Sequence, residues 1–484
     1  MKKGKKYLCA AASIVAFCYI PAVSVADEVA ITFYNTKADN SGYNGYTEGF
    51  ALVQDDRDIA FERGRMTVTL PGVSSAIDPA TVTFNADEIE IIEQNFDFDL
   101  LTPGKLLEKS VGETVEIVRV NPATGAEVQE KAKILSVNQG AVIEVGDKIE
   151  VLRDDNLPTR VIFDKVPDNL RASPTLSVQV DSEDASTRNA RLTYISGGLS
   201  WRGDYVALFD EKASTLDLQG WATIKNLTET TFENASLSLT AGAVSLSSSS
   251  ESWASRWQRR NNNRNRSRVR GGTEASDQER IGENYIYTLP GRTTVASNQT
   301  KQISLIEAQG VRAERVYEYH SDGFFTIEDP KNVDVRIAFS NSKAGGLSEP
   351  LPAGALRVYT RDSSGRAQFI GEDEIPNSPA GSDLSVRIGE AFDITVQPVA
   401  VYNGRPSRYH HQFKMKYTLR NAKSTTETVT IRQPSWWGWW RRWNETVTEE
   451  SHPHRENLRG ELVWDIEVPA RDEAVLEFTL DYKY

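Results

Sequence analysis

Residues 475–482, near the end of the chain, read Val-Leu-Glu-Phe-Thr-Leu-Asp-Tyr and decide the fold class. Apolar and polar residues alternate there, so Leu476, Phe478, Leu480 and Tyr482 share one face of an extended chain. A helix would instead spread these four side chains around its axis. The stretch therefore predicts a strand with one face in a core.

Strand-like sequence also occurs through most of the preceding chain. Short runs rich in Val, Ile, Thr and aromatic residues recur from residue 29 onward, separated by Gly, Pro, Asn and Asp. Such runs between turn residues are typical of strands. We expect strands at 29–34, 66–70, 88–92, 114–120, 133–137, 216–224, 333–339, 356–359 and 413–419. Helical pattern is scarce, and its best case is at 102–109, where Thr102 fits an N-cap and Pro103 the first helical position.

The predicted fold class is all-β, with multidomain antiparallel β-sandwiches, a small inserted β-barrel and very little helix. The chain has 484 residues, enough for two or three domains. Five closely spaced strand-like runs predict the barrel at about 112–165. Polar residues at 181–188 interrupt the apolar rhythm, which divides an N-terminal β domain (27–185) from a C-terminal β-sandwich region of one or two sandwiches (186–484). A Ser/Asn/Arg-rich insert at 245–279 is expected to be disordered.

Residues 1–26 have the pattern of a secretory signal peptide. Four lysines lie within the first six residues, an apolar stretch covers 7–20, and Ser24-Val25-Ala26 fits a signal-peptidase site. No later run of about 18 apolar residues follows. We therefore expect an exported protein, periplasmic or secreted, that is not integral to a membrane. Both cysteines, Cys9 and Cys18, would leave with the signal, so no disulfide is expected.

Charge and motifs narrow the function classes. The 68 acidic residues exceed the 55 basic ones and give a net charge of −13, so we expect no nucleic-acid partner. The chain lacks a Gly-x-Ser-x-Gly motif, a His-Glu-x-x-His motif, a phosphate loop and a dinucleotide fingerprint. We therefore expect no cofactor, no metal site and no identifiable catalytic residue. A non-enzyme is favoured, although a pair of Asp or Glu residues could still serve a glycan-active hydrolase.

Two segments are candidate binding elements. The first is an aromatic run that would present indole rings to a sugar face, a lipid interface or a protein partner, or else fold back as a plug over a core. It consists of Trp436, Trp437, Trp439, Trp440 and Trp443. The second is the basic part of the insert, which would bind a polyanion or be a solvated linker. Its arginines are Arg256, Arg259, Arg260, Arg264, Arg266, Arg268 and Arg270.

Several short motifs resemble one bacterial exported family. They lie at residues 49–53, 72–73, 76–79, 99–103, 194–202, 204–205, 220–221, 287–290, 300–302, 351–354, 357–359, 371–372 and 389–393. In this combination the chain resembles the family known as domain of unknown function 4139, related to mucoidy-inhibitor-A-like proteins. The resemblance implies a β-rich exported protein without an assigned activity, and it supplies no catalytic residue.

Together these observations predict a non-enzymatic exported cell-envelope protein with a binding or structural role. The expected partners are envelope polysaccharide, an anionic membrane surface or another envelope protein. The alternative is a glycan-active hydrolase that uses unidentified Asp or Glu residues.

Overall fold

The computed structural model describes residues 22–23, 28–34, 49–97, 101–121, 124–138, 140–152, 159–167, 170–171, 173–242, 268–270, 279–434, 444–456 and 461–483. Within these ranges, strands supply almost all of the regular structure, and the all-β prediction is confirmed. The predicted helix is also confirmed as α1 (Pro103–Lys109), where the Thr102 hydroxyl accepts a hydrogen bond from the Lys105 amide at 3.2 Å. No helix in the described ranges is both long enough and apolar enough to cross a bilayer.

Two sheets form the N-terminal layers, and their facing side chains make one core. The smaller sheet has the order β1-β4-β12-β6, with bounds β1 (Ala22–Val23), β4 (Gly64–Pro71), β12 (Thr175–Ser182) and β6 (Ile89–Asp97). The larger has the order β18-β19-β16-β2-β3-β13-β5, with bounds β18 (Glu279–Ile281), β19 (Asn284–Val295), β16 (Phe232–Ala241), β2 (Glu28–Tyr34), β3 (Phe50–Phe61), β13 (Ser186–Gly197) and β5 (Thr83–Ala86).

The larger sheet joins strands from both sides of the boundary expected near residue 185. β13 pairs antiparallel with β3 along its whole length, from Ser186 opposite Phe61 to Gly197 opposite Phe50. β16 pairs in parallel with β2. The division into 27–185 and 186–484 therefore stays a prediction about independent folding. The predicted signal peptide lies outside the described residues apart from β1, which pairs with β4.

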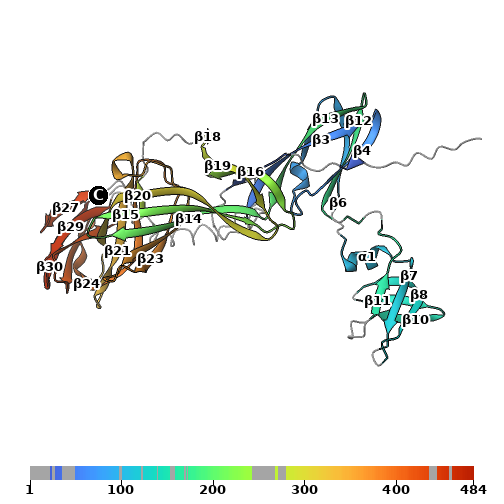
Figure 1. Ribbon diagram of the computed structural model, residues 1–484. Coiled ribbons are helices and arrows are strands. Elements are labelled where there is room, and N and C mark those ends of the chain that lie inside the picture. The colour runs from blue at the N-terminus through green and yellow to red at the C-terminus, as the bar shows by residue number, and fades with distance from the viewer. Residues whose placement is uncertain are drawn as a thin grey trace, which may run out of the picture.

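A separate five-stranded sheet occupies the position predicted for the small barrel. Its order is β10-β9-β8-β7-β11, with bounds β10 (Lys148–Leu152), β9 (Ala141–Val145), β8 (Glu127–Val137), β7 (Thr114–Val120) and β11 (Thr159–Ile162). Figure 1 shows this unit beside α1, at one end of the molecule.

The predicted barrel is corrected to an open, curled sheet. Among the described residues no ladder joins the edge strands β10 and β11, which have only five and four residues. Closing a barrel requires the edge strands to stagger and pair along their length. The sheet instead curls around a small core, Ile117, Ile134 and Ile143 among its members. Arg119 of β7 reaches Glu150 of β10 across the curl.

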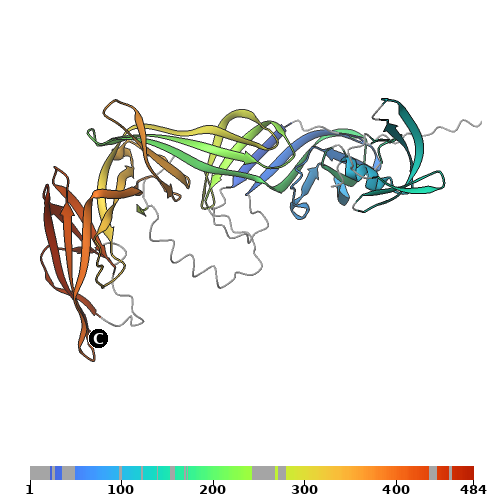
Figure 2. The same ribbon diagram turned by 90° about the horizontal axis from the view of Figure 1, so that it is seen from below.

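The C-terminal part is one 14-stranded sheet that bends into two regions. Its central strand, β20 (Gln299–His320), pairs first with β15 (Thr215–Asn226) and then with β21 (Lys331–Asn341) and β26 (Glu427–Gln433). Figures 1 and 2 show β20, β15 and β14 (Leu199–Asp210) running along the body of the molecule. The other strands are β17 (Arg268–Arg270), β22 (Gly354–Arg361), β23 (Ala367–Ile375), β24 (Ser382–Ser407), β25 (His410–Asn421), β27 (Asn444–Glu450), β28 (Arg455–Glu456), β29 (Leu462–Val468) and β30 (Asp472–Lys483).

The last strands close into a sandwich, which we call the C-terminal sandwich. β26 and β29 form part of one layer, β25 and β30 part of the other, and Trp464 of β29 stacks on Phe478 of β30 at 4.4 Å between ring centroids. The stretch at 475–482 lies within β30. Its four alternating apolar side chains, Leu476, Phe478, Leu480 and Tyr482, are all buried. The strand prediction made from that stretch is confirmed.

Several tyrosines are buried or partly buried between these sheets, and we expect alkaline pH to destabilise the fold. Burial raises the pKa of Tyr205 and Tyr417, and burial together with nearby Asp322 raises that of Tyr319 to about 12. Unfolded tyrosine ionises near pH 10. The tyrosines' contribution to stability is therefore complete below pH 10 and is lost as pH rises toward 12.

This expectation is tested by recording far-ultraviolet circular dichroism and the absorbance at 295 nm between pH 9 and 12. Tyrosinate absorbance of the buried rings should rise only as the strand signal is lost. The replacement Tyr319→Phe should move the loss to higher pH. Full titration of all tyrosines near pH 10 with an unchanged strand signal would contradict the expectation.

Candidate functional site

The structure places only part of the sequence-predicted binding set. The run Trp436, Trp437, Trp439, Trp440 and Trp443 lies outside the described residues, as do Arg256, Arg259, Arg260, Arg264 and Arg266. The remaining two arginines, Arg268 and Arg270, are the ends of strand β17. The two predicted binding elements therefore stay predictions.

Four residues of the 245–279 insert lie in strands, Arg268–Arg270 in β17 and Glu279 at the start of β18, and the disorder of the remaining insert stays a prediction. Strand β17 pairs antiparallel with the start of β24, with Arg270 opposite Asp383 and Arg268 opposite Ser385. A strand edge offers backbone donors and acceptors that a passing segment can satisfy, which is why so polar a segment can be extended and paired here. This pairing places exposed Arg270 beside a pocket in the sheet.

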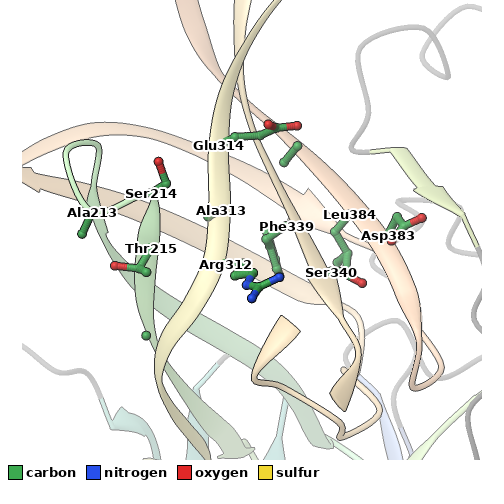
Figure 3. A pocket seen from close by; sticks show the side chains of 12 residues that line it. Ala213, Ser214, Thr215, Arg312, Ala313, Glu314, Phe339, Ser340, Asp383 and Leu384 are labelled. Carbon is green, nitrogen blue, oxygen red and sulfur yellow. The ribbon is translucent and has the colours of Figure 1, made fainter. Parts of the chain in front are cut away.

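That pocket lies where β20 leaves β15 and joins β21, and we call it the β20 pocket. Its volume is about 690 Å³. Figure 3 shows side chains reaching it from β15, β20, β21 and β24. Its lining residues are Ala213, Ser214, Thr215, Gly310, Arg312, Ala313, Glu314, Ala338, Phe339, Ser340, Asp383 and Leu384.

Backbone geometry shapes one rim of the β20 pocket. Ser214 holds φ at 55°, a left-handed conformation that non-glycine residues rarely adopt, in the turn between β14 and β15. The Asp210 carboxylate accepts hydrogen bonds from the Lys212 and Ala213 amides at 2.9 and 3.1 Å and so holds this turn. The Ser214 carbonyl accepts from the Ala313 amide at 3.0 Å, which ties the turn to β20.

Strand register brings polar side chains to one face of the β20 pocket. Thr215 is opposite Arg312, Ser340 is opposite Asp383, and Asp383 is opposite Arg270. Cross-strand neighbours project from the same face of a sheet. Residues alternate along a strand, so Phe339 and Leu384, at the positions next to Ser340 and Asp383, are buried and form the apolar part of the pocket lining.

The charged side chains of the β20 pocket have no partner among the described residues. No hydrogen bond or ion pair joins Arg312, Glu314 or Asp383 to another described side chain. Charged residues at nearby positions on the same strands do form ion pairs. Arg315 of β20 pairs with Glu211, and Arg387 of β24 pairs with Asp334 at 2.7 Å. Within the described part of the chain, the hydrogen-bonding capacity of Arg312, Glu314 and Asp383 is therefore not taken up by another side chain.

This arrangement has a definite recognition chemistry. A guanidinium donates paired hydrogen bonds to a carboxylate or phosphate. Carboxylates and hydroxyls such as those of Glu314, Asp383 and Ser340 can bind the hydroxyl groups of a sugar. The pocket volume also lies within the range of small-molecule sites, roughly 300–1,000 Å³.

These features define the class of the protein: an elongated all-β chain with a polar pocket at the bend of its largest sheet. The chain belongs to the family described as domain of unknown function DUF4139, which matches residues 190–484. The β20 pocket and the C-terminal sandwich both lie within that range, and the predicted family resemblance is confirmed there. The motifs quoted at 49–103 lie outside the matched range, and the relation to mucoidy-inhibitor proteins stays a prediction. No curated protein matches the chain.

Proposed function

We propose that this protein is a non-enzymatic binding protein of the cell envelope, exported by its signal peptide, and that the β20 pocket binds an anionic glycan. The observation that carries the proposal is a ligand-sized pocket lined by Arg312, Glu314 and Asp383, which pair with no other described side chain, together with the hydroxyls of Ser214, Thr215 and Ser340. An acidic sugar matches this set, because it carries one anionic group for the arginine and several hydroxyls for the carboxylates.

The proposal predicts a loss of affinity in pocket variants. Arg312→Ala removes the cation that would bind the acidic group, and a hydrogen bond to a charged group contributes about 1.5–3 kcal/mol. We expect the affinity of the full chain for a uronic-acid oligosaccharide to fall about 10-fold or more, as measured by titration calorimetry. A neutral oligosaccharide of equal length should bind weakly to both proteins.

The matched control is Arg361→Ala, which removes an exposed arginine on β22 outside the pocket. That variant should bind the acidic oligosaccharide like the wild type. Equal affinities of the Arg312→Ala and wild-type proteins would reject the pocket as the glycan site.

A second candidate function rests on one observation, namely that Glu314 and Asp383 line the same pocket. Glycoside hydrolysis uses two carboxylates on either side of the scissile bond. A hydrolase would release reducing ends from the polysaccharide, and Glu314→Gln or Asp383→Asn would abolish that release. The binding proposal expects no release by the wild-type protein.

The predicted tryptophan run belongs to the proposal as a second binding element, for polysaccharide, an anionic membrane surface or another envelope protein. It is supported by sequence alone, through the concentration of indole rings at 436–443. We expect Trp436→Ala/Trp439→Ala to reduce retention of the protein on its envelope fraction, and retention equal to that of the wild type would reject the run as a binding element.

A further inference from the structure

The hairpin that joins β24 to β25 exposes apolar and aromatic side chains at its end. We call residues 400–412 the hairpin tip. Val401 is 62% exposed, Tyr402 40% and Tyr409 53%, and the nearby Phe325 is 49% exposed. Figure 2 shows this hairpin in orange, projecting beyond the rest of the C-terminal sandwich close to the C-terminus. The tip therefore presents apolar surface at an extremity of the molecule.

The hairpin tip is also basic. Residues 401–411 include Arg405, Arg408, His410 and His411 and no acidic residue, although the whole chain is acidic. Arg405 and Arg408 are both exposed, and the Arg408 guanidinium lies 5.6 Å from the centroid of the Tyr409 ring. Lys483 of β30 is the register neighbour of His410 and adds a further cation at this end.

The base of the hairpin tip is a packed aromatic cluster. The His411 ring stacks on Phe413 with centroids 4.4 Å apart, and Phe413 stacks on Phe324 at 4.2 Å. His411 Nε2 and Asn403 Oδ1 are 2.9 Å apart, within hydrogen-bonding distance. These contacts fix the backbone on both arms of the hairpin at its base, which reduces the conformational freedom that the backbone loses on binding.

Local contacts also position two individual groups of the hairpin tip. The Tyr402 ring lies over Gly404, where an added Cβ would come within 2.6 Å of the tyrosine hydroxyl. His410 Nε2 lies 2.8 Å from the buried Asp481 carboxylate, which ties the end of β25 to β30. The tip is thus a preformed surface.

From this combination we propose that the hairpin tip docks on an anionic lipid bilayer, with Val401, Tyr402 and Tyr409 at the headgroup boundary. Tyrosine rings favour the membrane–water interface, where one part of the side chain is apolar and the other is wet. Arg405 and Arg408 would lie among anionic headgroups while their aliphatic stems cover apolar surface. Exposed Val401 favours a lipid over a soluble glycan, because a branched aliphatic side chain gains little from sugar hydroxyls.

The hairpin tip is a surface separate from the β20 pocket. The lipid-docking proposal and the glycan-binding proposal can therefore be rejected independently of each other. The full chain is sedimented with vesicles of phosphatidylglycerol and phosphatidylcholine, and separately with vesicles of phosphatidylcholine alone. We expect binding to the anionic vesicles. Arg405→Glu/Arg408→Glu should weaken that binding at least 25-fold, since each basic residue near an anionic surface contributes roughly fivefold.

Removing the exposed tyrosine rings should weaken vesicle binding through loss of apolar contact with the lipid, without any change of charge. Tyr402→Ser/Tyr409→Ser should lower binding to anionic vesicles about 10-fold or more. The matched control Phe392→Ser changes an aromatic residue that is 90% exposed on the same strand but lies away from the tip. The charge control Lys148→Glu/Lys165→Glu makes an identical charge change in the residues around the five-stranded sheet. Both controls should bind like the wild type.

Two results would overturn the proposal. One is wild-type protein that stays in the supernatant with anionic vesicles. The other is vesicle binding that both tip variants retain in full. If the tip variants instead lose retention on acidic polysaccharide and keep vesicle binding, the tip is a glycan-binding surface. All substituted side chains are exposed, so an unchanged near-ultraviolet circular dichroism spectrum verifies folding.

Discussion

Replacing Asp55 with alanine is expected to lower the unfolding free energy of the N-terminal layers by about 3–5 kcal/mol. Asp55 and Arg57 lie two residues apart on β3, so both side chains project into the core, where they are 4% and 2% exposed. Arg57 Nη2 lies 2.5 Å from the Asp55 carboxylate and donates to the Pro71 carbonyl of the facing sheet at 3.0 Å. The alanine variant would leave the guanidinium charge buried without its carboxylate.

The measurement is denaturant unfolding of the full chain, with hydrogen exchange of β3 and β13 peptides as the local readout. The double variant Asp55→Leu/Arg57→Met removes both charges and keeps side-chain volume, so it should recover most of the loss. The exposed ion pair between Arg191 and Asp56, 2.7 Å apart, is the matched control, and Asp56→Ala should cost less than about 1 kcal/mol. Similar losses for Asp55→Ala and Asp56→Ala would contradict the expectation.

The second large effect is expected from Trp464→Ala in the C-terminal sandwich. Trp464 is fully buried and stacks on Phe478, and its indole Nε1 donates to Glu450 at 3.0 Å. Truncating a buried tryptophan leaves a cavity and costs about 3–5 kcal/mol. Hydrogen exchange of β29 and β30 should therefore accelerate, while exchange in the five-stranded sheet should not change.

The variant Trp464→Phe separates the packing of the ring from its hydrogen bond. It keeps an aromatic ring against Phe478 and loses the donor to Glu450, so its loss should be about 1–2 kcal/mol. If Trp464→Phe were as damaging as Trp464→Ala, the hydrogen bond rather than the ring packing would hold the two layers together.

Local pattern was enough to predict many of the strands. Residues 114–120 were expected as a strand and form β7 with the same bounds, and the helix begins after Thr102 as expected. In both places the signal lies within a few neighbouring residues: apolar alternation for β7, and a capping residue followed by proline for α1.

β3 was missed, and its composition gives the reason. Its centre, residues 54–58, reads Gln-Asp-Asp-Arg-Asp, a run typical of an exposed turn. The strand forms because Asp55 is paired with Arg57 inside the core, and because β2 and β13 pair with it on either side. Neither stabilising partnership is visible from local pattern.

The β20 pocket could not be found in the sequence for a related reason. Arg312, Glu314 and Asp383 are exposed strand residues in runs that alternate like many others in this chain. They line the same pocket because β20 and β24 both flank β21, which is a property of strand order. The segments that did stand out by composition, the tryptophan run and most of the arginine insert, lie outside the described residues.

The length of β20 has a mechanical consequence. One unbroken 22-residue strand pairs with β15 along its first part and with β21 and β26 along its last part. Tension between the two ends of the molecule would pass along this backbone and shear its ladders, loading many hydrogen bonds at once. A protein tethered at both ends would therefore resist stretching through the hydrogen bonds that this one strand makes.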